Sequence, residues 1–176
     1  MFYYLAIGTN IYPEKNSVAI IRKLIEEFGI LYVFPFIRTQ PENLHTRNYF
    51  LNSVVIISSE LDERDIKARL NAIESMLGRD RNDPDSSNKD RPADIDILET
   101  CETLSADTHP QTKESFIQDV LDYSGRISDL SDYGLPFFNR ATIVNLDAAS
   151  GDIIIVDNTL DGFIRQQEST FITGVD

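Results

Sequence analysis

The sequence is short of several features on which whole classes of protein depend. Cys101 is its only cysteine, so no disulfide can form within the chain and a reducing compartment is expected. No apolar run approaches the roughly 20 residues that a transmembrane helix needs. The N-terminal residues lack the basic segment of a signal peptide, so we expect a cytoplasmic protein.

Basic side chains are scarce in the second half of the chain. Residues 91–176 carry 5 basic and 16 acidic side chains, whereas residues 1–90 carry 11 and 13, and the formal net charge is −13. An acidic half repels nucleic-acid backbones and anionic membranes, so we expect neither as a partner. Any anion must therefore bind through a local arginine cluster or a metal ion.

What remains is an ordinary globular composition. The 176 residues are 41% hydrophobic and 26% charged, with eight glycines and seven prolines. This length predicts one domain with a sizeable core, and we expect a monomer or a weak homodimer.

Hydrophobic periodicity predicts alternating strands and helices in the first part of the chain. Asp62 has the character of an N-cap, and Pro35 indicates an edge or a bulge in its strand. The order is β-α-β-β-α-β, which predicts an α+β, ferredoxin-like sandwich with a mostly antiparallel sheet and both helices on one face. The expected strands cover 3–7, 30–37, 49–58 and 93–98, and the expected helices cover 15–28 and 62–77.

Beyond residue 98 the pattern is weaker. We expect loops over 99–112 and 125–136, a helix over 113–124, a strand over 152–156 and fraying of the last ten residues. Residues 39–48 and 79–92 are polar loops within the first part.

The residues with the clearest chemistry lie between 78 and 98. On a strand, Asp94 and Asp96 point to the same side, about 6.6 Å apart. Two carboxylates at this spacing can hold one or two hard divalent cations, and guanidinium groups nearby can neutralise a triphosphate. The alternatives are solvated aspartates, as in the loop sequence Asp83-Pro84-Asp85, and arginines that merely follow a helix C-terminus.

Four blocks of this sequence resemble the 6-hydroxymethyl-7,8-dihydropterin pyrophosphokinase family. The last block is the most specific, because an arginine precedes the first aspartate by three residues and a Gly-Arg-x-Arg lies upstream. The blocks are Ala6-Ile7-Gly8-Thr9-Asn10, Arg38-Thr39-x-Pro41, Tyr49-Phe50-Leu51-Asn52, and Ile73-Glu74-x-x-x-Gly78-Arg79-x-Arg81 with Arg91-x-x-Asp94-x-Asp96-Ile97-Leu98.

The resemblance implies an enzyme that transfers diphosphate from ATP to a pterin hydroxymethyl group, with two Mg²⁺ ions held by Asp94 and Asp96. ATP and the pterin are then its partners, and folate biosynthesis its pathway. Its implied catalytic residues are Arg79, Arg91, Asp94 and Asp96. Nucleotide contacts are implied for Asn71, Glu74, Arg81 and Arg140, and pterin contacts for Gly8, Thr39, Phe50 and Asn52.

The resemblance is good over residues 1–98 and poor over 99–176, where we expect an acidic insertion near 99–133 within one domain. The best downstream match to the family's Arg-x-Phe is Asn139-Arg140-Ala141-Thr142, with threonine in place of the second pterin-stacking ring, and the family's histidine falls near Gly134. Two alternatives therefore stay open. One is a diphosphokinase for a different ring, and the other is a catalytically degenerate module that binds a nucleotide or another ligand.

Overall fold

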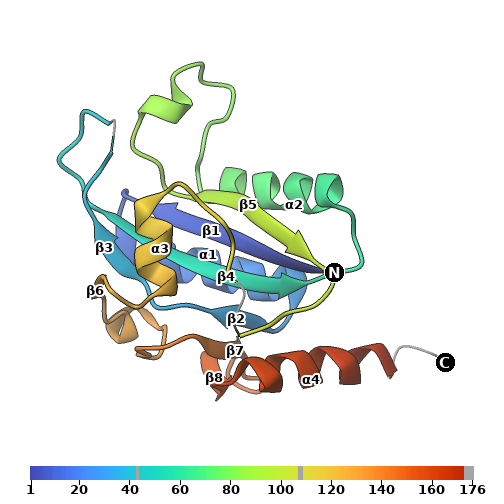
Figure 1. Ribbon diagram of the computed structural model, residues 1–176. Helices are drawn as coiled ribbons and strands as arrows, with labels where there is room; N and C mark the ends of the chain where they lie inside the picture. The colour runs from blue at the N-terminus through green and yellow to red at the C-terminus, as the bar shows by residue number, and fades with distance from the viewer. Residues whose placement is uncertain (43, 107–108, 173–176) are drawn as a thin grey trace.

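The computed structural model describes residues 1–42, 44–106 and 109–172. Its described residues form one eight-stranded sheet whose strands differ in length, with helices on both faces (Figure 1). The strands run in the order β5-β1-β4-β2-β7-β8, with β3 beside β4 and β6 beside β3, and each of these pairs is antiparallel. The strands are β1 Phe2–Thr9, β2 Leu31–Val33, β3 Ile37–Thr39, β4 Phe50–Ser58, β5 Asp94–Cys101, β6 Arg126–Ile127, β7 Thr142–Leu146 and β8 Ile153–Asp157. The helices are α1 Pro13–Phe28, α2 Glu63–Met76, α3 Ser115–Leu121 and α4 Leu160–Ile172, with short 3₁₀ turns at Ser86–Asn88 and Ser131–Tyr133.

The first 101 residues form the predicted β-α-β-β-α-β unit. Strand β1 lies at its centre between β4 and β5, and the expected strand over 30–37 is present as two pieces, β2 and β3, that both pair with β4. The interruption contains Pro35, which has no amide hydrogen to donate. The predicted α+β class and mostly antiparallel sheet are therefore confirmed.

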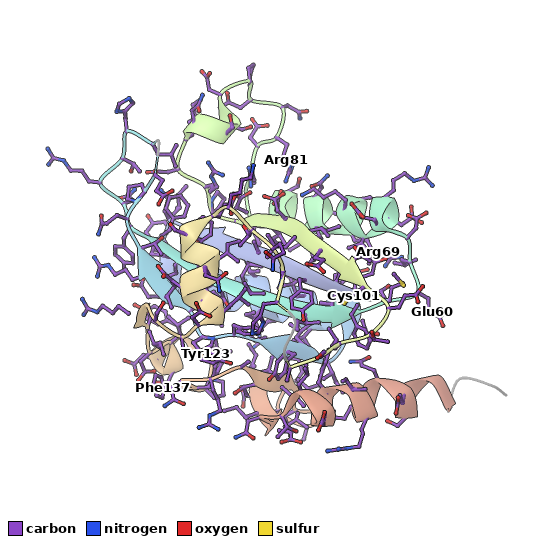
Figure 2. All side chains as sticks on the ribbon, in the orientation of Figure 1. Glu60, Arg69, Arg81, Cys101, Tyr123 and Phe137 are labelled. Atoms are coloured by element: carbon purple, nitrogen blue, oxygen red, sulfur yellow. The ribbon has the colours of Figure 1, made fainter. Side chains whose placement is uncertain are left out.

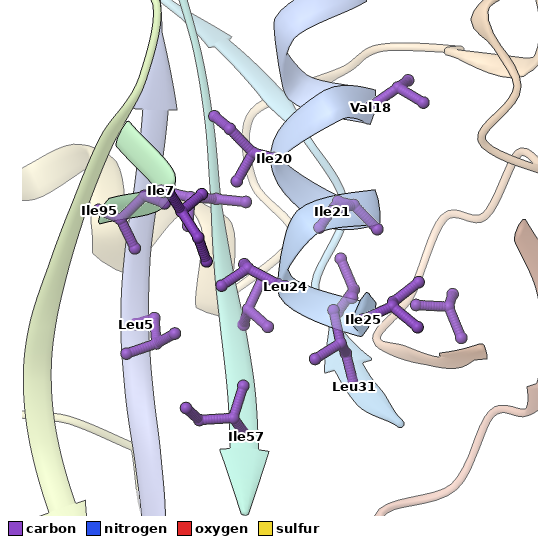
Figure 3. Packing of buried hydrophobic residues seen from close by; sticks show 14 of the residues in the cluster. Leu5, Ile7, Val18, Ile20, Ile21, Leu24, Ile25, Leu31, Ile57 and Ile95 are labelled. Atoms are coloured by element: carbon purple, nitrogen blue, oxygen red, sulfur yellow. The ribbon is translucent and has the colours of Figure 1, made fainter. Parts of the chain in front are cut away.

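One face of the sheet carries α1 and α2, as the sequence predicted. Alternate residues of β1, namely Tyr3, Leu5 and Ile7, point to this face and are buried. Figure 3 shows Leu5 and Ile7 facing Ile20 and Leu24 of α1 in this core.

The opposite face is covered by α3 and α4. The other alternate residues of β1 point this way, and Tyr4 contributes to a second cluster with Ile117 of α3 and Phe163 of α4. Near the other end of β1 the residues on this face shorten to Ala6 and Gly8, so the covering helices leave space there.

The second half of the chain holds more regular structure than its sequence predicted. β5 continues through residues expected to be loop and ends at Cys101, while β7 and α4 were not anticipated at all. Strand β7 is only five residues long and lies between β2 and β8. Its formation therefore depends on pairing with these strands rather than on the pattern of its own residues. Fraying was expected over the last ten residues; of these, 167–172 belong to α4, and positions 173–176 lie outside the described residues. Among the described helices, none combines the length and apolarity needed to cross a membrane.

Candidate active site

The two aspartates of β5 border a hollow of about 480 Å³ on the α3 face of the sheet. Asp94 pairs with Gly8 and Asp96 with Ala6, so both carboxylates rise from the same side of β5 beside the two smallest residues of β1. The hollow is lined by Ala6, Ile7, Gly8, Thr39, Gln40, Glu42, Leu44, Phe50, Asn52, Arg91, Asp94, Asp96, Ile97, Leu98, Glu114 and Phe116.

Asp94 lies between two arginines. Nη1 of Arg91 donates to its Oδ2 at 2.6 Å, and Nη1 of Arg79 donates to its Oδ1. Burial alone raises the pKa of the Asp94 carboxyl, but the hydrogen bonds and charges of Arg79 and Arg91 outweigh burial, so this pKa lies below its usual value. Asp94 is therefore held as a carboxylate.

Glu74 of α2 lies beneath this cluster and is fully buried. It accepts a hydrogen bond from the backbone amide of Ile95 at 2.6 Å, and it pairs with Arg79 and Arg81. Burial raises its pKa against the opposing effect of that amide and the two arginines. The resemblance implied that Glu74 contacts a nucleotide, but its side chain is not exposed to the hollow. It instead holds Arg79 and Arg81 next to β5.

Asp96 has a partner that sequence analysis missed. Nζ of Lys67 reaches from α2 around the edge strand and donates to Asp96 Oδ1 at 2.6 Å and to the Ile95 carbonyl at 3.0 Å. The Asp96 side chain is 61% exposed, so this ion pair is open to solvent. The sequence carried a faint signal, because Lys67 is a charged residue next to the buried Ile66 and about one turn before the buried Leu70.

Two aromatic rings and two polar side chains line the rest of the hollow. Phe50 lies at the start of β4 and Phe116 on α3, while Nδ2 of Asn52 donates to Oγ1 of Thr39 at 2.7 Å. Gly8 leaves the space that Asn52 occupies, because a Cβ there would collide with Asn52 Oδ1. All four residues that the sequence assigned to the pterin therefore border one hollow.

The hollow has an excess of negative charge that suits a cation. Glu42 and Glu114 join the aspartates at its lining. The pKa of Glu114 is raised by burial first and then by the charges of Asp96, Asp94 and Glu42. The described residues offer no cluster of three or more metal-ligating side chains, so a divalent ion would complete its shell with water or phosphate oxygens.

The matches to known proteins extend over most of this geometry. The family model described as 7,8-dihydro-6-hydroxymethylpterin-pyrophosphokinase (HPPK) matches residues 4–122. The chain belongs to the HPPK family. Proteins named 2-amino-4-hydroxy-6-hydroxymethyldihydropteridine pyrophosphokinase from two strains of Porphyromonas gingivalis are each 37% identical over 98 residues. These alignments cover 54% of this chain and 66% of the relatives, just under two thirds of their length.

The HPPK match changes the interpretation of residues 99–122. It continues through α3, beyond the limit of residue 98 expected from the sequence, and includes much of the segment that we took for an insertion. Phe116 follows Asp96 by 20 residues and lies inside the matched range, whereas Arg140 follows Asp96 by 44 and lies outside it. A phenylalanine at the shorter spacing is the signal in the sequence that could have pointed to α3.

The expected match at 139–142 lies beyond the residues that the family model covers and does not line the hollow. Thr142 is buried in β7, where it pairs with Val33 and donates to the Arg140 carbonyl at 3.0 Å. Arg140 precedes β7, four strand spacings from β5 or roughly 19 Å. It lines a separate hollow with Tyr123 and Asn139, and Figure 2 shows Tyr123 and Arg81 well apart, beyond opposite ends of α3.

Two further expected nucleotide residues do not line the hollow. Arg81 is partly exposed and its guanidinium is paired with Glu74. Asn71 of α2 has a buried Oδ1 for which the described residues provide no hydrogen-bond partner. Both remain predictions as nucleotide contacts.

Proposed function

We propose that this protein transfers diphosphate from ATP to the hydroxymethyl group of 6-hydroxymethyl-7,8-dihydropterin in a Mg²⁺-dependent reaction of folate biosynthesis. One observation carries the proposal. In a member of the HPPK family, a pair of strand aspartates shares a single hollow with two phenylalanines and a hydrogen-bonding asparagine. The names of the P. gingivalis relatives agree with this reaction.

The pterin ring is proposed to bind between Phe50 and Phe116. Flat aromatic rings are held well by other aromatic rings, and each good pair is worth about 0.5–1.5 kcal/mol beyond the area that it buries. The polar edge of the ring would then meet Asn52 and Thr39, whose amide and hydroxyl can both donate and accept. Because Gly8 leaves space for the Asn52 side chain, Asn52 would meet the ring at this wall.

The phosphates are proposed to lie against Arg91 and Arg79, next to the aspartates. Guanidinium groups provide forked donors that match phosphate oxygens, and both groups are already fixed by Asp94. Asp94 and Asp96 would hold Mg²⁺, two ions in this proposal, and bound Mg²⁺ supplies positive charge to the phosphate oxygens. Orientation of the hydroxymethyl group by the ring contacts would supply the second part of the rate enhancement.

A turnover assay tests the proposal. The protein is mixed with ATP, Mg²⁺ and 6-hydroxymethyl-7,8-dihydropterin, and AMP is measured by chromatography. We expect AMP only when the pterin is present, and its loss in Asp94→Ala. Asp85→Ala is the matched control, since Asp85 is the exposed second aspartate of an Asp-x-Asp in the 79–92 loop. Full AMP formation by Asp94→Ala refutes the assigned role.

The acidity of the hollow favours one alternative, a diphosphokinase for a more cationic ring. Glu42 and Glu114 face the same space as the aspartates, and an amino-substituted or protonated ring would neutralise them. In that case Mg-ATP binds normally by calorimetry, while the pterin gives neither heat nor AMP.

A further inference from the structure

We propose that Asp90 is a positioning residue that joins the two loops beside the hollow and, through Asn10, fixes the backbone of Arg91. Only the link to turnover rests on the proposed function. The joining of the loops is a property of the protein without ligands.

The Asp90 carboxylate accepts hydrogen bonds from two distant parts of the chain. Nδ2 of Asn10, just beyond β1, donates to Oδ1 at 2.6 Å. From the 39–48 loop, Oγ1 of Thr46 and Nδ2 of Asn48 donate to Oδ2 at 3.1 Å and 2.5 Å. One side chain of the 79–92 loop is thus held both by the end of the central strand and by the neighbouring loop.

The same asparagine holds Arg91. Side-chain Oδ1 of Asn10 accepts a hydrogen bond from the backbone N–H of Arg91 at 2.8 Å. The backbone N–H of Asn10 donates to the backbone carbonyl of Arg91 at 3.2 Å. Asn10 is 2% exposed, so its amide group has no water to take the place of these partners. Because Asp90 occupies its Nδ2, the Oδ1 atom stays directed at Arg91, whose guanidinium reaches Asp94.

Asp90 is also the point at which the two loops meet. Among the described residues 39–42 and 44–48, every side chain that forms a hydrogen bond with the 79–92 loop donates it to Asp90. Gln40, Glu42 and Leu44 of the first loop line the hollow. A change at Asp90 therefore reaches the wall of the hollow on one side and Arg91 on the other.

A carboxylate side chain suits this position because its two oxygens accept hydrogen bonds, and the side chains of Asn10, Thr46 and Asn48 all donate to them. Replacing it with alanine leaves the buried Nδ2 of Asn10 without its partner and releases Thr46 and Asn48. A Thr46→Val/Asn48→Ala variant instead removes only the contacts with the first loop. The two variants separate the two functions of the carboxylate.

Backbone ¹⁵N relaxation on the protein without ATP or pterin tests the joining of the loops. In Asp90→Ala we expect the order parameters of residues 46–48 and of Arg91 to fall from about 0.85 to below about 0.6. In Thr46→Val/Asn48→Ala only 46–48 should change. Asp83→Ala is the control, because Asp83 binds Lys89 and the Asp85 amide inside its own loop.

The proposal is overturned if Asp90→Ala leaves 46–48 ordered, or if Asp83→Ala loosens them equally. Should Asp90→Ala fail to fold, unchanged order at 46–48 in the double variant overturns it as well. These measurements involve no substrate, so a failure of the proposed reaction cannot affect them.

Kinetics then separate positioning from general stability. We expect the double variant to raise KM for the pterin with little change in kcat, because only the wall of the hollow is loosened. Asp90→Ala should in addition lower kcat between about ten- and a hundredfold, the range expected when a catalytic group is misplaced by about 1 Å. Equal kcat values for the two variants would contradict a role through Arg91.

Discussion

Replacing Glu74 with glutamine tests how much the buried ion pairs of Glu74 with Arg79 and Arg81 contribute to the stability of the protein. Glutamine has nearly the same shape and can still accept from the Ile95 amide, but it removes the negative charge that Arg79 and Arg81 face. The Arg79 side chain is only 9% exposed, so water cannot replace the lost partner. Glu74→Gln therefore leaves a buried positive charge that only Asp94 still balances.

The magnitude follows from burial. Breaking a buried ion pair by removing one partner costs about 3–5 kcal/mol. We expect the lower end, about 3 kcal/mol, because burial already disfavours the ionised form of Glu74 and raises its pKa. For a domain of this length, such a loss lowers the melting temperature by about 6–12 °C.

Urea unfolding of the wild type and two variants measures this effect. Glu27→Gln is the control, because it breaks the Glu27–Arg69 pair, whose side chains are 31% and 49% exposed. An exposed pair contributes less than about 1 kcal/mol. The reasoning is refuted if Glu74→Gln costs under about 1 kcal/mol, or if both variants cost the same.

Three more changes have definite expected outcomes. Phe116→Leu should weaken pterin binding up to about tenfold in calorimetry through loss of one stacked ring, and unchanged affinity would remove Phe116 from the site. Lys67→Met should tighten Mn²⁺ binding about two- to fivefold by electron paramagnetic resonance, because the ion no longer competes with an exposed ammonium for Asp96, whereas Lys23→Met on α1 should have no such effect. Burial raises the pKa of Tyr32 to about 12, so its contribution to stability is present below pH 10 and lost as the pH rises to about 12. Unfolding free energies of Tyr32→Phe should therefore decline less over this range, and an identical decline would refute the assignment.

Local signals in the sequence predicted the first part of the fold well. The amide of Asp65 donates to Asp62 Oδ1 at 2.9 Å, as expected of an N-cap, and the break around Pro35 follows from its missing amide hydrogen. Asp94 and Arg91 belong to the most specific of the four blocks, and they form an ion pair.

Contacts between distant residues were beyond such reasoning. Lys67 reaches Asp96 because α2 lies beside the edge strand, and Phe116 reaches the hollow because α3 covers the far face of the sheet. Arg140 matched a motif arginine in the sequence, but it precedes β7, a strand that pairs with β2 and β8 and in which Thr142 is buried. Where periodicity is weak, a matching residue type at the wrong spacing is a poor guide.

The position of the one thiol has a practical consequence for spectroscopy. Cys101 pairs with Phe2 at the end of β5 opposite Asp94, seven residues and roughly 23 Å along the strand (Figure 2). A fluorophore attached there sits on rigid sheet, outside both loops, and no other cysteine competes for it. Burial raises the pKa of this thiol, so coupling calls for mildly alkaline buffer. Paired with a second dye introduced at Arg47, it would turn the distance between loop and sheet into a single-molecule signal.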